Sequence, residues 1–246
     1  MTGRAARCTF ALALSLAFAG VACSKSDDAR IVHASAADHG RAVFEDPKAS
    51  PSASNAFSCA TCHEAAGASD HVRAGGSLAG VTQRASFWGG MRLDLLESIN
   101  DCRLLFMDAP APWTADDEEA RAMYAYLASL ASLAGDGQPA AFTFVRASPD
   151  VAAGDPANGQ RIYDRACATC HGSAHDGVGR LVDFAPRLPD DVNASHATLA
   201  PLERRLVFLR KVREGAFVGG AGSMPPFSRE ALSDADLGAV LAFLGQ

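Results

Sequence analysis

The sequence lacks three features that would place it in other classes of protein. After its N-terminal segment it has no apolar run long enough to span a bilayer, so we expect any membrane contact to be an anchor. It lacks a basic excess, because 22 Lys and Arg residues stand against 28 Asp and Glu residues, and this excludes nucleic acid as an expected partner. Neither half contains a convincing β pattern, so we predict an all-α fold.

The N-terminal residues have the pattern of a secretory signal peptide over residues 1–22. Arg4 and Arg7 precede a short apolar run, and small residues follow it. Cys23 comes next and resembles a bacterial lipoprotein processing site, with Gly20 where Leu is usual. We predict export to the periplasm and a lipid anchor on Cys23, with ordinary cleavage nearby as the alternative. The mature chain then keeps 20 basic and 28 acidic residues, a formal charge of about −8.

Few cysteines are available for disulfide bonds, although the chain contains seven. Cys8 lies in the signal peptide, Cys23 lies at the processing site, and four more form two Cys-x-x-Cys pairs. Only Cys102 remains. This spacing argues against the disulfide framework that an exported chain would otherwise suggest.

Composition divides the mature chain into two domains. Residues 23–37 are polar and Ala-rich and are predicted to form a tether. The Gly- and Pro-rich residues 135–152 are predicted to form a linker. We therefore predict one domain over residues 38–134 and a second over residues 153–246.

The two predicted domains show the same order of signals, which indicates an internal repeat. Each starts with a short amphipathic segment, and the first domain then has extra residues, 45–56, predicted to be an inserted surface loop. Each continues with an apolar-periodic helix and ends with an acid-started helix. These helices are predicted over residues 93–106, 116–133, 202–217 and 233–244. Thr114 and Ser233 are the predicted N-caps of the two final helices, and the basic face of the helix over residues 202–217 is expected to be solvated.

The motif Cys-x-x-Cys-His occurs at the same place in both halves of this repeat. Two thiols three positions apart match the two vinyl groups on one edge of a porphyrin, and the adjacent imidazole can reach the iron. We therefore predict two covalently bound haem c groups. Their attachment residues are Cys59, Cys62, Cys167 and Cys170, and their proximal iron ligands are His63 and His171. A zinc site shared by the two pairs would leave both histidines unexplained, and a thioredoxin-like redox pair would need a strand-helix-strand setting that is missing.

On these motifs, both halves resemble class I cytochrome c domains, over about residues 38–133 and 155–246. The resemblance implies two tandem cytochrome c-like helical domains joined by a linker. It also implies a methionine as the sixth iron ligand, from a loop before the last helix. Met224 is the only methionine of the second half and fits that loop. Met107 precedes Tyr126-Leu127 by the same 19 residues that separate Met224 from Phe243-Leu244, so we predict that both methionines are ligands.

The first site leaves an alternative open. Met91 and Met123 are further methionines there, and Met123 is expected in the core. Cys102 is the rival ligand, because a thiolate also binds iron and residues 99–103 resemble a stretch of sulfur-oxidising cytochromes. A buried cysteine is equally an ordinary small hydrophobe.

The resemblance further implies residues that support the haem. Pro186 is expected to offer its carbonyl to the second nitrogen of His171, with Gly76 as its counterpart in the first half. Candidates for hydrogen bonds to the haem propionates are Arg84, Trp88 and Arg187.

Two protein ligands on each iron would leave no position for a substrate. We therefore expect an electron carrier that cycles between Fe(II) and Fe(III), exchanges electrons with a protein donor and a protein acceptor, and has no catalytic residues. The alternatives are a thiosulfate-oxidising enzyme that uses Cys102, a peroxidase, and a haem subunit or sensor of a larger respiratory complex.

Overall fold

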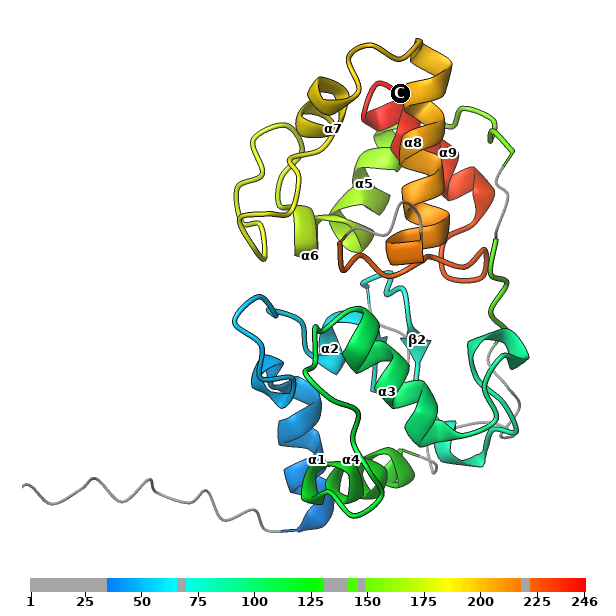
Figure 1. Ribbon diagram of the computed structural model, residues 1–246. Helices are drawn as coiled ribbons and strands as arrows, with labels where there is room; N and C mark the ends of the chain where they lie inside the picture. The colour runs from blue at the N-terminus through cyan, green and yellow to red at the C-terminus, as the bar shows by residue number, and fades with distance from the viewer. Residues whose placement is uncertain (1–34, 66–69, 131–140, 146–148, 218–221) are drawn as a thin grey trace, which may run out of the picture. The chain divides into compact units, whose positions relative to one another are not determined.

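The computed structural model describes residues 35–65, 70–130, 141–145, 149–217 and 222–246 (Figure 1). The predicted signal peptide, Cys23, most of the predicted tether and half of the predicted linker lie outside these residues. The longer helices are α1 (Ala36–Glu45), α3 (Leu95–Leu105), α4 (Glu118–Ser129), α5 (Pro156–Ala166), α8 (Pro201–Glu214) and α9 (Asp234–Phe243). The shorter ones are α2 (Cys59–Cys62), α6 (Ala168–His171) and α7 (Asp190–Ser195). The described residues are thus rich in helix, as predicted.

Strands make up little of the described residues. β1 (His63–Glu64) and β2 (Gly76–Ser77) form one short parallel pair, with His63 opposite Gly76. The amide of Gly75 donates to the Cys62 carbonyl at 2.8 Å. This pair therefore fixes the first Cys-x-x-Cys-His motif against the loop that follows it.

Helices α1 and α4 pack against each other at a glycine (Figure 1). The side chain of Ser35 caps α1 by accepting a hydrogen bond from the Asp38 amide at 3.1 Å. A Cβ atom on Gly40 would lie 1.9 Å from the carbonyl oxygen of Ala122 in α4. Only glycine allows the two backbones to approach this closely.

Helices α5 and α9 repeat the arrangement in the second half. The side chain of Asp155 caps α5, and Pro156 occupies its first position, where a missing amide hydrogen costs nothing. A Cβ atom on Gly159 would lie 2.0 Å from the carbonyl oxygen of Ala239 in α9. The two helix pairs are therefore built in the same way.

An aromatic pair next to each glycine extends the correspondence. Phe44 of α1 lies against Tyr126 of α4, with ring centroids 5.4 Å apart at an interplanar angle of 53°. Tyr163 of α5 lies against Phe243 of α9, at 5.6 Å and 55°. Both pairs lie in or beside apolar cores: one includes Phe44, Val81, Met123 and Leu127, and the other Tyr163, Leu209, Leu237 and Leu241.

The start of α4 differs from the prediction. Thr114 is not its N-cap; the helix begins at Glu118 after Asp117. The Thr114 amide donates to the Asp117 carboxylate at 2.6 Å, so residues 114–117 form a turn before the helix. The prediction for α9 is confirmed, because Ser233 accepts from the Asp236 amide at 3.1 Å.

The basic face of α8 is only partly solvated, so that expectation was wrong for two of its arginines. Arg213 is 1% exposed and Arg205 is 9% exposed, whereas Arg210 is exposed. Carbonyl oxygens and one carboxylate surround each buried guanidinium. Helical periodicity alone could not reveal these acceptors, since they come from other segments.

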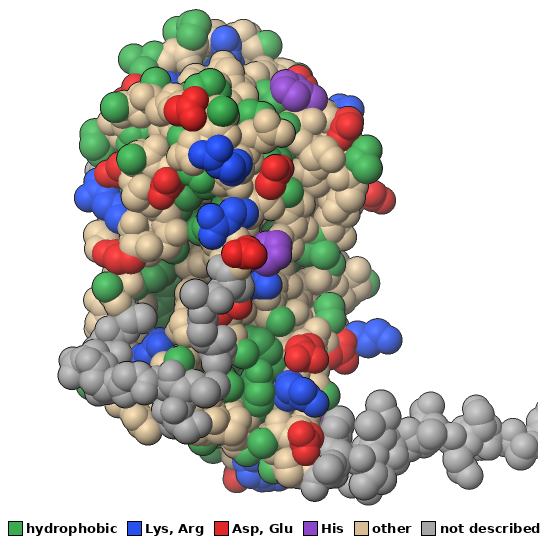
Figure 2. Space-filling view, turned by 180° about the vertical axis from the view of Figure 1, so that it is seen from behind, with side chains coloured by type: hydrophobic (Ala, Val, Ile, Leu, Met, Phe, Trp, Pro, Cys, Tyr) green, Lys and Arg blue, Asp and Glu red, His purple; other side chains and the backbone are tan. Residues whose placement is uncertain are grey.

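The surface of the described residues carries both charge signs. Figure 2 shows Lys and Arg side chains interspersed with Asp and Glu over the face that is drawn. Within the described ranges no helix combines the length and the apolar character needed to cross a membrane.

Candidate haem-binding sites

The first motif forms a single helical turn, α2. The Ser58 amide donates to the Thr61 hydroxyl at 3.0 Å, and the Thr61 amide donates to the Ser58 carbonyl at 3.0 Å. This closed turn places Cys59 and Cys62 on one cavity, with His63 immediately after them. The three side chains that the sequence predicted to act together are therefore adjacent.

The second motif is continuous with the helix before it. α5 ends at Ala166, α6 begins at Ala168, and Cys167 is the single residue between them. The amides of Cys170 and His171 donate to the Cys167 carbonyl at 3.1 Å and 2.9 Å. Gly172, with φ of +67°, then turns the chain away. This half has no inserted loop, and the motif follows directly from the helix that packs on α9.

His171 has the hydrogen bond that was expected from Pro186. Its Nδ1 atom lies 3.0 Å from the Pro186 carbonyl oxygen. A carbonyl only accepts, so Nδ1 carries the proton in this bond and Nε2 is left as the lone-pair donor. Burial lowers the pKa of His171, while the contact with Pro186 raises it. A neutral imidazole with a fixed tautomer is the form that binds a metal.

The pKa of His63 is also lowered, but its neighbours differ from those of His171. Burial lowers its pKa to about 4, and the nearby peptide groups of Gly76 and Gly75 oppose that shift. Its Nδ1 atom is buried and makes no hydrogen bond of normal geometry with the described residues. A Cβ atom on Gly75 would lie 2.2 Å from the His63 ring. The hydrogen bond that was expected between Gly76 and His63 is therefore not formed with normal geometry, and Gly75 is the residue that the ring packs on.

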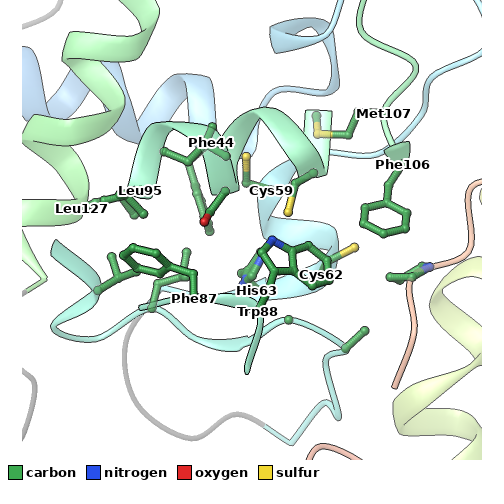
Figure 3. A pocket seen from close by; sticks show the side chains of 18 of the residues that line it. Phe44, Cys59, Cys62, His63, Phe87, Trp88, Leu95, Phe106, Met107 and Leu127 are labelled. Atoms are coloured by element: carbon green, nitrogen blue, oxygen red, sulfur yellow. The ribbon is translucent and has the colours of Figure 1, made fainter. Parts of the chain in front are cut away.

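A large apolar cavity lies beside the first motif. It measures about 1190 Å³ including its opening to solvent. Figure 3 shows Cys59, Cys62 and His63 at this pocket, with Phe87 and Trp88 beside them. The remaining apolar lining includes Phe44, Phe57, Leu78, Val81, Leu95, Ile99, Phe106 and Leu127. Such a lining suits a flat, apolar cofactor held by thioether bonds.

Both candidate sixth ligands of the first site line this cavity. Met107 is 4% exposed and lies next to Phe106 (Figure 3). Cys102 lies in α3, and burial together with the nearby Cys59 and Cys62 raises its pKa strongly. The structure therefore brings both sulfur atoms to the site, and Met107 remains a prediction. Met123 is 1% exposed and belongs to the core, as expected, where it also borders the cavity, whereas Met91 is 51% exposed.

Met224 lies in the loop between α8 and α9. Its carbonyl accepts from the Ala216 amide at 2.8 Å, and Pro226 after it is buried. Both Met224 and Cys167 pack against the core that contains Tyr163. The structure thus places the predicted axial methionine beside the same core as the predicted attachment cysteine.

The three proposed propionate partners differ in position. Arg84 lines the first cavity and donates to the carbonyls of Ser77 and Ala79 at 2.9 Å and 2.8 Å. Trp88 also lines it. Arg187 instead pairs with Asp191 at 2.6 Å, in an exposed position. Arg84 and Trp88 therefore lie at the first site, and a propionate contact of Arg187 at the second stays a prediction.

Sequence reasoning missed Arg73. Its guanidinium donates to the carbonyls of Ala60 and Thr61 at 2.6 Å and 3.1 Å, and it also pairs with Glu64. It therefore fastens the loop after the first motif to the motif itself. An arginine in a loop carries no spacing signal that would have identified this role.

The donor atoms fit a covalently attached haem better than a zinc ion. All five described cysteines are free, and burial raises the pKa of Cys59 to about 11 and of Cys62 to about 12. The two thiols are thus protonated beside a neutral histidine and an apolar cavity. In the described ranges no three His, Cys, Asp or Glu side chains gather into a metal-binding group.

These features fit a helical protein that holds a covalently attached haem. Residues 154–244 match the family described as "Cytochrome C oxidase, cbb3-type, subunit III". The match supports a c-type cytochrome: a cytochrome c domain carries covalently bound haem c and transfers electrons through it. No curated protein matches the chain.

Proposed function

We propose that this chain is an exported dihaem c-type cytochrome that carries electrons between protein partners. The observation that carries the proposal is the repeated construction of the two halves. Each has a Cys-x-x-Cys-His turn with a half-buried histidine whose pKa is lowered, and a first and last helix that cross at a glycine. The family match covers only the second half, and this correspondence extends the assignment to the first.

The ligand sets proposed are His63 with Met107 and His171 with Met224. In both, the histidine is a neutral nitrogen donor and the methionine supplies a soft thioether, which favours the reduced iron. Such a pair leaves no coordination position for a substrate, so the chemistry that a bound haem supplies is one-electron transfer. The chain's own residues hold the ligands and exclude water from the apolar cavity.

A haem subunit of a larger respiratory complex is the second candidate. The matching family is that of an oxidase subunit, which favours this candidate. Both candidates need the same haem sites, and they differ in whether the chain is isolated alone or with other subunits. Purification in mild detergent from the native membrane distinguishes them.

Location is part of the proposal. A signal peptide over residues 1–22 directs export, and a lipid on Cys23 holds the mature chain at the membrane, facing the periplasm. The charges that Figure 2 shows are of both signs, so we expect docking through that face to depend weakly on ionic strength.

Mass spectrometry of the denatured protein, purified from a host that attaches haem c, tests the haem count and the processing together. We expect the mass of a chain beginning at a lipid-modified Cys23 plus two haems. Replacing Cys59 and Cys62 by Ser should remove one haem, and replacing Cys167 and Cys170 should remove the other. A mass that corresponds to one haem in the wild-type protein would contradict the dihaem proposal. Turnover of thiosulfate or peroxide by the purified holoprotein would contradict the proposal that it only carries electrons.

A further inference from the structure

Arg213 is the most deeply buried charged side chain of the described residues that is not part of a proposed haem site. It leaves α8 near its C-terminal end and is 1% exposed. Its Nη1 atom donates to the carbonyls of Phe227, Ser228 and Leu232 at 3.1, 3.2 and 2.7 Å. Its Nη2 atom donates to Asp234 at 2.8 Å. One guanidinium therefore holds the segment between Met224 and α9.

Backbone hydrogen bonds fasten the same segment at Met224 and three residues after it. The Ala216 amide donates to the Met224 carbonyl at 2.8 Å, and the Phe227 amide donates to the Val212 carbonyl at 2.9 Å. Met224 thus lies in a short stretch whose path is set by the end of α8. The buried side chain of Arg213 binds the carbonyls of the residues that follow this stretch.

Arg103 occupies the corresponding place in the first half. It leaves α3 near its C-terminal end, is 4% exposed, and donates to the Ala111 carbonyl at 3.1 Å. Its guanidinium carbon lies 3.8 Å from the centroid of the Trp113 ring. The Ala109 amide donates back to the Arg103 carbonyl at 2.9 Å. The segment just after Met107 is therefore also tied to the arginine of the preceding helix.

One acceptor of each guanidinium lies at the same distance from its methionine, although Arg103 precedes Met107 by four residues and Arg213 precedes Met224 by eleven. Ala111 lies four residues after Met107, and Ser228 lies four residues after Met224. A buried guanidinium is costly to desolvate, and packed apolar side chains would stabilise a core at least as well. A role in holding one loop in one conformation accounts for its presence in both halves.

We infer that Arg103 and Arg213 are equivalent positioning residues that hold the loops carrying Met107 and Met224, and so keep each thioether on its iron. This inference rests on the proposed function, because it assumes His/Met ligation at both haems. It assigns neither arginine a contact with haem or substrate. Each acts through the loop carbonyls that it binds.

Added imidazole measures this role directly in the ferric full-length holoprotein. Imidazole binds the iron only when the methionine has dissociated from it. The apparent affinity for imidazole therefore rises in proportion to the fraction of protein whose iron lacks the methionine. We expect Arg213→Met and Arg213→Lys to tighten imidazole binding at least about tenfold at one haem. We expect Arg103→Met and Arg103→Lys to do so at the other haem. The thioether-to-iron absorption band of the same haem should weaken in parallel.

Arg205 provides a matched control on the same helix. It is 9% exposed and donates to Asp150, Val151 and Gln246, away from the methionine loop. Arg205→Met should lower the unfolding temperature without changing imidazole affinity. If Arg213→Met fails to fold, Asp234→Asn is the second variant, because it weakens the contact of the Arg213 guanidinium with residue 234 without removing the arginine. We expect it to tighten imidazole binding less than Arg213→Met would.

The outcomes distinguish a failure of the inference about the arginines from a failure of the proposed His/Met ligation. If the wild-type protein shows no thioether band, the His/Met ligand sets fail and the inference fails with them. If the wild-type protein shows the bands but the folded arginine variants bind imidazole like the wild type, the inference alone is overturned. The same holds if Arg205→Met tightens imidazole binding as much as Arg213→Met does.

Discussion

Gly159 and Ala239 bring the backbones of α5 and α9 into direct contact. A Cβ atom at Gly159 would lie 2.0 Å from the Ala239 carbonyl oxygen and 2.9 Å from the Cβ of Phe243. The oxygen belongs to a helical backbone and cannot move aside as a flexible side chain could. Gly40 and Ala122 stand in the same relationship in the first half, at 1.9 Å.

Gly159→Ala should therefore destabilise the second half. We expect a loss of about 1–3 kcal/mol, because the added methyl group forces the two helices apart, and this outweighs the helix propensity that alanine gains. Gln160→Ala, at the exposed neighbouring position, is the control and should change little. Chemical denaturation followed by circular dichroism measures both, and equal stability of the two variants would argue against the close crossing.

Met107→Ala distinguishes the two sulfur ligands of the first site. We expect it to abolish the thioether-to-iron band of one haem and to leave the other, while Cys102→Ala leaves both. Met123→Ala is the matched control: this methionine is 1% exposed, so its loss should cost about 2–5 kcal/mol of stability while both bands remain. A spectrum that changes only in Cys102→Ala would show that the cysteine is the ligand.

Asp191 should make the stability of the second half sensitive to acid. Hydrogen bonds from the Arg187 side chain and backbone lower its pKa to about 2 from an ordinary value of 3.8. A carboxyl whose pKa is lowered on folding stabilises the protein above the unfolded value, so this contribution is lost as the pH falls from about 4 to about 2. Arg187 adjoins Pro186, whose carbonyl contacts His171. The ion pair between Arg187 and Asp191 therefore holds the loop that contains Pro186.

Asp191→Asn should accordingly lower the unfolding temperature at pH 7 and flatten its decline between pH 4 and pH 2. Asp183→Asn, which removes an exposed carboxylate from the same loop, should leave the acid decline as in the wild type. Thermal unfolding at a series of pH values measures all three proteins. Parallel curves for Asp191→Asn and the wild type would contradict the assignment.

The sequence by itself determined the parts of this protein that depend on neighbours along the chain. The spacing of Cys59, Cys62 and His63 fits one helical turn, and Ser233 caps the helix that follows it because its hydroxyl reaches an amide three residues ahead. The correspondence between the halves was also readable, since Gly40 and Gly159 begin the same pattern. Such features need only local geometry.

Tertiary structure alone decided what surrounds each arginine. The sequence predicted a solvated basic face on α8, and yet Arg213 is buried because carbonyls from 14 to 19 residues further along the chain converge on it. Likewise, spacing favoured Met107, whereas the fold brings both Met107 and Cys102 to the cavity beside His63. Periodicity identifies one face of a helix, but the acceptors and ligands that meet that face are fixed only when distant segments pack together.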